Sequence, residues 1–373
     1  MITTIRQNLE KLLIIPLLEN RCQGLNEIVI YGAGSNGRIV AREFARQGVA
    51  IRAFLDERAV QLGVVEGIPC HHPQSEEARH LAFDCMSAVI GVFNYAADPA
   101  PVWAVLRECG FESIISYFEA HEFLELPEHF WLGSRKWLKE QKEEILKGFD
   151  LLDDEISRQI YHDHIALRLT FQPDLLSDPD ITGQYAPSDL PRNREPMRLI
   201  DGGAFDGDTL KYFLEGEYTL EAVAAFEPDT VNFHQLCATA RHYLNQVKEM
   251  LLIPAGVGGG TGVCRFQSGQ GAGSRVLDEG DMIIPIMALD DIMPNFNPTL
   301  IKLDIEGAEP DALKGAEKLI SQYQPDLAVC VYHTPGHLWE LPMLMNRLLP
   351  NHQLFLRVHR FNGFDTVAYA MKR

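Results

Sequence analysis

Three acidic residues lie at the end of a short apolar run in the C-terminal half of the sequence. The run from Leu300 to Asp304 predicts a buried strand, and Glu306 and Glu309 follow shortly after it. Ligands of open α/β sheets bind outside the carboxyl ends of the strands, so we expect Asp304 and Glu306 to point the same way and to orient a hydroxyl group or take its proton. The alternative is a charged strand end, in which Glu309 and Pro310 only start a helix.

His333 is a further candidate for proton transfer. It follows the expected strand Leu327 to Tyr332 and precedes a turn made by residues 334–336. Histidine exchanges protons near neutral pH, so Asp304, Glu306 or His333 can be the general base for a hydroxyl nucleophile. A structural or capping role for the histidine stays open.

A glycine turn between residues 199 and 209 is the strongest binding motif. An apolar strand leads into this turn and then into a helix, so the backbone can approach a nucleotide-like ligand and helix N–H groups can face it. Such turns also occur for tight packing alone. Glu227 ends the next expected strand, where an acid accepts both hydroxyls of a ribose, although it could instead cap the helix that starts near Asp229.

A second glycine turn lies near the N-terminus. Gly32, Gly34 and Gly37 follow an expected strand, open a helix and precede Asp56, which is the context that the dinucleotide-binding fingerprint requires. An NAD(P)- or sugar-nucleotide-binding enzyme that uses this motif is therefore the alternative interpretation. Hydride transfer also needs a catalytic Lys, Tyr or His near the nicotinamide, and residues 57–115 contain no recognisable arrangement of that kind.

The hydrophobic pattern predicts α/β structure on both sides of a helical connector. In the N-terminal part, strands alternate with helices, which predicts a parallel sheet with right-handed crossovers. Charged, leucine-spaced segments from Glu119 to about Phe171 predict connecting helices. Residues 178–196 are rich in proline and predict an exposed loop at the border of the active site.

The C-terminal part predicts seven strands, and only a short link separates the last two. This pattern indicates a mostly parallel sheet closed by an antiparallel strand. We therefore expect an α/β protein with two Rossmann-like domains: residues 1–118 form a nucleotide-binding domain, residues 119–196 a helical connector and loop, and residues 197–373 the catalytic domain. The expected strands of the catalytic domain are 198–201, 222–227, 250–254, 300–304, 327–332, 353–358 and 366–371.

Composition restricts the partners. The chain has 52 acidic and 33 basic residues, and its formal net charge of −19 repels nucleic-acid phosphates and anionic lipid surfaces. Seven cysteines without a C-x-x-C pair indicate a reducing compartment and argue against structural zinc. We expect a cytoplasmic protein with no nucleic-acid partner, no membrane contact and no metal, and we leave a homo-oligomer open.

Four sequence blocks of the C-terminal half resemble those of a known family. In order, they are Asp201-Gly202-Gly203-Ala204 with Gly207-Asp208-Thr209, Phe226-Glu227-Pro228, Ala288-Leu289-Asp290-Asp291, and residues 301–309 with Leu313-Lys314-Gly315-Ala316. Their order and spacing between residues 198 and about 335 resemble the FkbM-type methyltransferase family, whose cofactor is S-adenosylmethionine. Because the blocks match together, the resemblance is more specific than any single one of them.

The resemblance implies the class I methyltransferase fold and O-methylation of a hydroxyl group on a sugar or secondary-metabolite acceptor. Asp304 and Glu306 would face the reacting methyl group, with His333 completing the candidate catalytic set. A sulfonium methyl is already electrophilic, so such an enzyme mainly aligns the acceptor oxygen and excludes water. The residues implied to bind the cofactor are Asp201, Gly202, Gly203, Phe205, Asp206, Glu227 and Pro228.

The N-terminal part carries a second resemblance. Residues 31–34, 54–57 and 67–69, together with Gly63, are similar to the small Rossmann-like nucleotide-binding domains of sugar-modifying enzymes. Such domains bind a sugar nucleotide or only support the partner domain. The expected partner of the whole chain is therefore a small-molecule acceptor, a sugar or a sugar nucleotide among the options.

Overall fold

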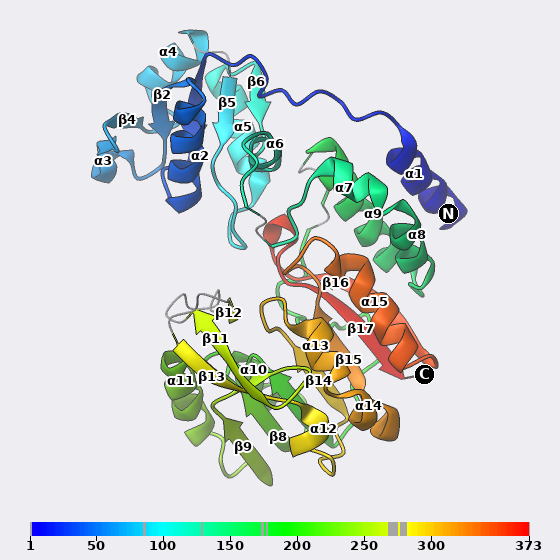
Figure 1. The fold of residues 1–373 in the computed structure, drawn as a ribbon. Coiled ribbons are helices and arrows are strands. Elements are labelled where there is room, and N and C mark those ends of the chain that lie inside the picture. Colours follow the sequence, from blue (N-terminus) through cyan, green and yellow to red (C-terminus); the bar gives the residue numbers. More distant parts are fainter. Residues whose placement is uncertain are drawn as a thin grey trace. The chain divides into compact units, whose positions relative to one another are not determined.

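The computed structural model describes residues 2–84, 87–127, 130–172, 175–176, 178–267, 275–276 and 282–372. The chain forms two compact units, each of which contains a large sheet (Figure 1). Unit 1 consists of Met1–Glu143, Gln159–Pro179 and Val358–Phe364. Unit 2 consists of Glu144–Arg158, Asp180–Arg357 and Asp365–Arg373.

A six-stranded sheet organises unit 1. Its order is β3-β4-β2-β1-β5-β6, and all pairs along it are parallel except β3 with β4. The central strand β1 is almost wholly buried because its side chains are apolar and mostly β-branched. The strands are β1 (Glu27–Tyr31), β2 (Ala50–Leu55), β3 (Val64–Val65), β4 (Ile68–His71), β5 (Ser87–Ile90) and β6 (Ser113–Ile115).

Helices α2 to α6 pack around this sheet. Side-chain oxygens of Asp98, Ser116 and Ser134 accept backbone N–H bonds at the starts of α5, α6 and α7, and these caps fix where the helices begin. Beyond α7, helix α8 belongs to unit 2 from Glu144 onward, and α9 passes from unit 2 into unit 1 at Gln159. The helices of this part are α1 (Ile2–Ile14), α2 (Ser35–Arg46), α3 (Ala59–Leu62), α4 (Glu76–Asp84), α5 (Pro99–Cys109), α6 (Tyr117–Phe123), α7 (Arg135–Glu140), α8 (Lys142–Asp150) and α9 (Glu155–Thr170).

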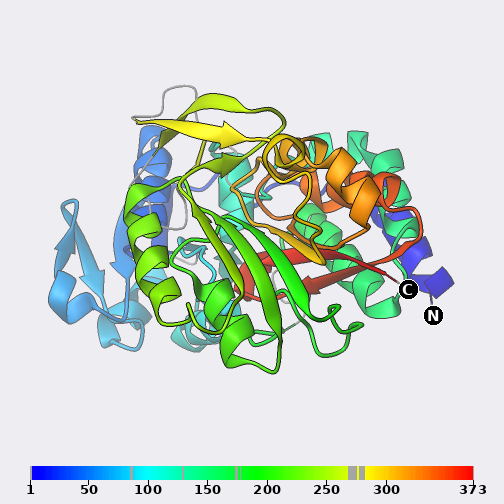
Figure 2. The ribbon, with the colours of Figure 1, turned by 90° about the horizontal axis from the view of Figure 1, so that it is seen from below.

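Unit 2 contains the seven-stranded sheet that the sequence predicts. Its order is β16-β17-β15-β14-β7-β8-β9, and β17 runs antiparallel to β15, while the strands from β15 to β9 are parallel (Figure 2, β17 in red). The prediction of a parallel sheet closed by an antiparallel strand is confirmed. The strands are β7 (Met197–Gly202), β8 (Leu220–Phe226), β9 (Glu249–Ile253), β14 (Leu300–Leu303), β15 (Asp326–Cys330), β16 (His352–Val358) and β17 (Thr366–Lys372).

The other elements of unit 2 surround this sheet. A small second sheet has the order β10-β13-β11-β12 and is made of β10 (Gly256–Val257), β11 (Gly262–Gln267), β12 (Arg275–Val276) and β13 (Met282–Met287). The helices are α10 (Asp208–Glu215), α11 (Thr230–Arg241), α12 (Leu289–Ile292), α13 (Glu309–Lys314), α14 (Glu317–Tyr323) and α15 (His337–Leu348). The short η3 (Phe361–Gly363) follows β16 and belongs to unit 1.

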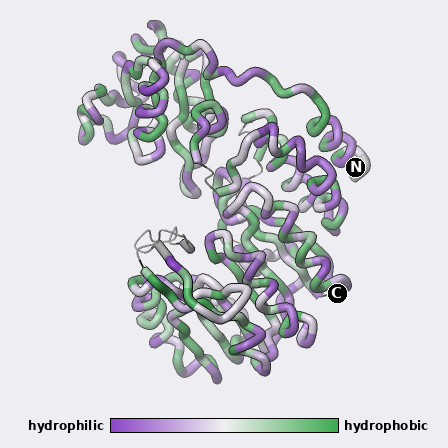
Figure 3. The backbone as a smooth tube through the Cα atoms, viewed as in Figure 1, coloured by the Kyte–Doolittle hydropathy of each residue, from purple (hydrophilic) through white to green (hydrophobic). Residues whose placement is uncertain are grey.

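Burial explains which strands hold the site. Every residue of β14 and β15 is buried, and so are nearly all residues of β7 and β8, so their carboxyl ends are held rigidly. Hydrophobic stretches run through both parts of the chain (Figure 3). Among the described residues, no helix is both long and apolar enough to cross a membrane.

Candidate active site

The glycine turn after β7 packs directly against the end of β14. Gly203 has a φ of 76°, and a Cβ atom there would lie 1.9 Å from the carbonyl oxygen of Asp304, so no other residue fits without displacing the backbone. Gly207, with a φ of 89°, begins helix α10. The turn therefore packs against the acidic segment after β14 and leads directly into helix α10.

Glu227 braces the same turn from the end of β8. Its two carboxylate oxygens accept backbone N–H bonds from Phe205 at 2.9 Å and from Asp229 at 2.8 Å. The helix α11 is capped by the carboxylate of Asp229, which accepts from the N–H groups of Val231 and Asn232. Burial raises the pKa of Glu227 to about 7, although both backbone bonds oppose the shift.

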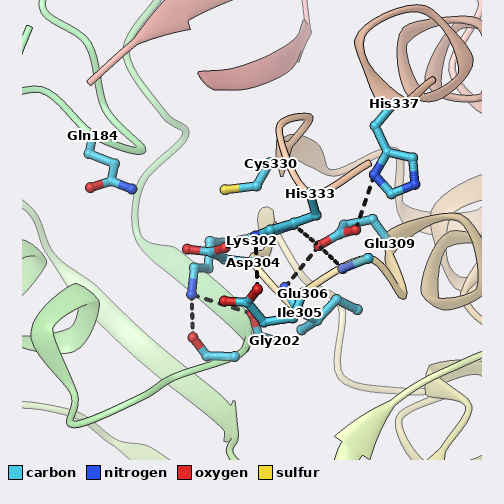
Figure 4. A network of polar contacts seen from close by, with 12 residues as sticks. Gln184, Gly202, Lys302, Asp304, Ile305, Glu306, Glu309, Cys330, His333 and His337 are labelled. Atoms are coloured by element: carbon cyan, nitrogen blue, oxygen red, sulfur yellow. Dashed lines mark hydrogen bonds and ion pairs between the residues drawn. The ribbon is translucent and has the colours of Figure 1, made fainter. Parts of the chain in front are cut away.

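Lys302, on β14, connects this strand to β7 and to the glycine turn. It forms a buried ion pair with Asp201, with Nζ 2.9 Å from Oδ1, and it donates hydrogen bonds to the carbonyl oxygens of Gly203 at 2.5 Å and Gly202 at 3.3 Å (Figure 4). Burial alone would lower the pKa of Lys302, but Asp201 and neighbouring carboxylates raise it above its usual value. The lysine thus stays charged and fixes both glycines.

Asp304, Glu306 and His333 come together at the carboxyl end of the sheet. His333 Nε2 lies 3.3 Å from Asp304 Oδ1 and 3.7 Å from Glu306 Oε2. On its other side, His333 Nδ1 lies 2.8 Å from Oε1 of the fully buried Glu309, whose Oε2 is 3.4 Å from Nδ1 of His337 (Figure 4). A single imidazole therefore stands between three carboxylates.

This arrangement decides the charge of the histidine. Burial opposes protonation, but Glu309, Glu306 and Asp304 together raise the pKa of His333 well above its ordinary value. The same contact with His333 lowers the pKa of Asp304 against the effect of burial. The three carboxylates therefore favour the protonated form of His333.

Glu306 is held in an uncommon backbone conformation. Its φ of 57° lies in the left-handed region, and Gly307 follows with a φ of 105°. Glu309 stabilises this turn because its Oε1 accepts from the backbone N–H of Ile305 at 2.9 Å. Such strain is typical of residues whose direction matters for function.

Tyr185 is a site residue that the sequence did not reveal. Its hydroxyl donates to Asp304 Oδ2 at 2.9 Å, and it accepts from Nε2 of Gln184 at 3.0 Å. The Tyr185 backbone N–H donates to the Tyr369 hydroxyl at 3.1 Å, which anchors the residue to β17. Its only sequence signal was its place in the proline-rich segment 178–196.

The N-terminal glycine turn of unit 1 resembles the turn after β7, but its acid, Asp56, has different hydrogen-bond partners from Glu227. Gly32 has a φ of 96°, and a Cβ on Gly37 would lie 1.9 Å from the Gly32 carbonyl oxygen, whereas nothing lies within 4 Å of a Cβ on Gly34. Asp56 accepts from the Ala33 N–H at 2.9 Å and from the Arg58 guanidinium at 3.0 Å. Burial opposes its ionisation, but these partners lower the pKa of Asp56 to about 2.

No group of three or more His, Cys, Asp or Glu side chains suited to hold a metal ion occurs in the part of the chain that the structure describes. The carboxylates at the end of β14 share His333 instead, and Asp304 also accepts from Tyr185.

Comparisons with known proteins agree with this geometry. Residues 201–363 match the family model of the methyltransferase FkbM domain, which confirms the resemblance of the C-terminal half. A crystal structure of methyltransferase FkbM from Methylobacillus flagellatus KT is similar to this chain, with a TM-score of 0.77, 22% sequence identity and coverage of 99% of each chain. At this identity the likeness concerns the fold. The comparison with curated proteins found no match. These findings support a methyltransferase.

Proposed function

We propose that this chain transfers a methyl group from S-adenosylmethionine to a hydroxyl group of a small acceptor, a sugar or a secondary metabolite. The observation that carries the proposal is the meeting of three features at one sheet edge: the glycine turn after β7, the carboxylate of Glu227 and the acid cluster of Asp304 and Glu306. The match of residues 201–363 to a methyltransferase family supports it.

The residues of the turn fit the cofactor. Each oxygen of Glu227 accepts only one backbone bond, and a carboxylate oxygen has two lone pairs, so both can still accept a ribose hydroxyl. The glycines allow close backbone approach on the same side. We assign cofactor binding to Glu227 with Pro228 and to the turn residues Asp201, Gly202, Gly203, Phe205 and Asp206.

The cofactor supplies an electrophilic methyl group, so the protein must position the acceptor oxygen and remove its proton. Asp304 and Glu306 are the candidates for that proton because both carboxylates lie beside His333, and contact with His333 lowers the pKa of Asp304. His333 then serves as the neighbour that keeps Asp304 deprotonated. Tyr185 fixes the second oxygen of Asp304, which orients the first toward the cluster.

A calorimetric titration with S-adenosylhomocysteine, followed by a methyl-transfer assay on a panel of hydroxylated acceptors, tests the proposal. We expect wild-type protein to bind S-adenosylhomocysteine. We expect the Asp304→Asn variant to bind it equally well but to lose turnover. The proposal would be contradicted if the protein bound no S-adenosylhomocysteine. It would also be contradicted if the Asp304→Asn and Glu306→Gln variants both kept full turnover on an identified acceptor.

The N-terminal motif supports a second candidate, a nucleotide site at Gly32, Gly34, Gly37 and Asp56. The open space at Gly34 favours it, since a ligand phosphate can approach the start of α2 there. Titration with NADH and with a sugar nucleotide tests this candidate, with Gly34→Ala as the variant expected to lose binding.

A further inference from the structure

Unit 1 contains a cavity that neither glycine turn uses. Its volume is about 740 Å³, and pockets for small organic ligands span roughly 300–1,000 Å³. One face of α5 forms a wall, and the other walls come from α6, α7, the end of α9 and the segment Val358–Gly363. All of these segments belong to unit 1, so the cavity lies within one compact body.

Arg135 is the most buried cation among the described residues of the cavity wall. Its Nε donates to Glu122 at 2.9 Å, and its guanidinium carbon lies 4.2 Å from the ring centroid of Phe171. The terminal nitrogens Nη1 and Nη2 have no hydrogen-bond partner among the residues that the structure describes. These two groups can therefore donate to a ligand with acceptor oxygens.

A second pair of donor groups lies on α5. The Nε1 atom of Trp103 is buried and has no hydrogen-bond partner in the described part of the chain. The guanidinium group of Arg107 lies over the Trp103 ring, 5.6 Å from its centroid, and both side chains line the cavity. Arg107 makes no ion pair with any described acid, so its charge is available to a ligand.

The acids of the cavity wall do not neutralise these donors. Glu119 accepts from the Arg21 backbone at 2.7 Å and from its guanidinium group at 2.6 Å, so its charge is already balanced. Asp98 accepts from the Ala100 N–H at 2.9 Å as the cap of α5. The two remaining acids, Glu19 and Asp178, are exposed. None of these four acids forms an ion pair with Arg135 or Arg107 among the described residues.

We propose that this cavity binds an anionic small molecule in which a phosphate or carboxylate group is attached to a ring. The anionic group meets Nη1 and Nη2 of Arg135, whose planar geometry matches two oxygens at once. The ring packs against the aromatic walls of Trp103 and Phe171. The site is independent of the proposed methyl transfer, because it uses no residue of the glycine turns or of the acid cluster.

Calorimetric titrations of the full chain at low ionic strength test the proposal with three probes that share one ring: glucose 6-phosphate, glucuronate and glucose. We expect at least one anionic probe to bind and neutral glucose not to bind, and the preferred anion distinguishes a phosphate site from a carboxylate site. Equal affinities for all three probes, or binding of none of them, overturn the proposal.

Variants locate the binding. We expect Arg135→Gln to lower the affinity for the anionic probe by at least about 10-fold, since it removes bonds to a charged group. Arg107→Gln and Trp103→Phe should lower this affinity several-fold. Arg46→Gln on the exposed side of α2 is the matched control and should leave affinity unchanged. Because Arg135→Gln removes the partner of Glu122 and can unfold unit 1, the other two variants decide the matter. Wild-type affinity in both would place the ligand elsewhere and refute the proposal.

Discussion

The substitution Glu227→Gln measures how the proposed cofactor is held. Each oxygen of Glu227 already accepts one backbone bond and can accept one ribose hydroxyl as well. Hydrogen bonds to charged groups contribute about 1.5–3 kcal/mol each. Glutamine retains a single acceptor oxygen and turns an amide donor toward a backbone N–H group. We therefore expect a loss of about 2–3 kcal/mol, which is about a 30- to 150-fold weaker affinity for S-adenosylhomocysteine.

The pH dependence of binding provides an independent measure of the same contact. Burial raises the pKa of Glu227 to about 7 in the ligand-free protein, and hydroxyl donors stabilise its ionised form. Ligand binding therefore lowers this pKa and releases a proton below pH 7. Affinity should be constant at higher pH and should fall, by up to about tenfold per pH unit, as pH drops below about 7.

Calorimetry between pH 5.5 and 8.5, in buffers of different ionisation enthalpy, measures both the affinity and the released proton. Glu221→Gln is the matched control, because Glu221 lies on the same strand β8 but pairs with Lys248 at the surface. If Glu227→Gln and Glu221→Gln bind the adduct equally tightly, or if wild-type affinity does not change between pH 8 and pH 6, the ribose assignment is wrong.

Three further substitutions test other parts of the site. Tyr185→Phe removes one of the contacts that lower the pKa of Asp304, after those of His333 and Lys302, so the acidic limb of the kcat/KM profile should move upward while the affinity for S-adenosylhomocysteine stays unchanged. Gly203→Ala should lower the free energy of unfolding, measured by urea titration, by more than about 2 kcal/mol, because residue 203 has a positive φ and its Cβ would lie 1.9 Å from a backbone oxygen. Gly34→Ala should change this free energy by less than about 1 kcal/mol, because a Cβ there has no neighbour within 4 Å. Lys302→Met leaves a buried carboxylate uncompensated and should destabilise the protein by about 3–5 kcal/mol, and a thermal midpoint equal to wild type would contradict the ion pair.

Local sequence signals predicted the sheet of unit 2 because each strand is an apolar run that ends at a turn or a charged residue. The same signals placed Asp304 and Glu306 at the carboxyl end of β14. They could not predict the contact of Tyr185 with Asp304, because the two residues are far apart in the sequence and Tyr185 lies in an irregular segment without periodicity. The charge of His333 was equally out of reach, since it depends on a buried carboxylate 2.8 Å away rather than on the histidine itself.

The two glycine turns show how the same local design can serve different purposes. In each turn an acid at the end of the second strand accepts a backbone N–H from the turn, Asp56 from Ala33 and Glu227 from Phe205. Asp56 is also bound by the guanidinium group of Arg58, so a ribose at that position must first displace a charged partner that keeps the carboxylate ionised. Glu227 has only backbone donors, and burial disfavours its ionised form and raises its pKa. Hydroxyl donors of a ligand would stabilise that ionised form. A ligand with a ribose diol therefore gains more at Glu227 than at Asp56, which is why we assign the adenosine part of the cofactor to unit 2.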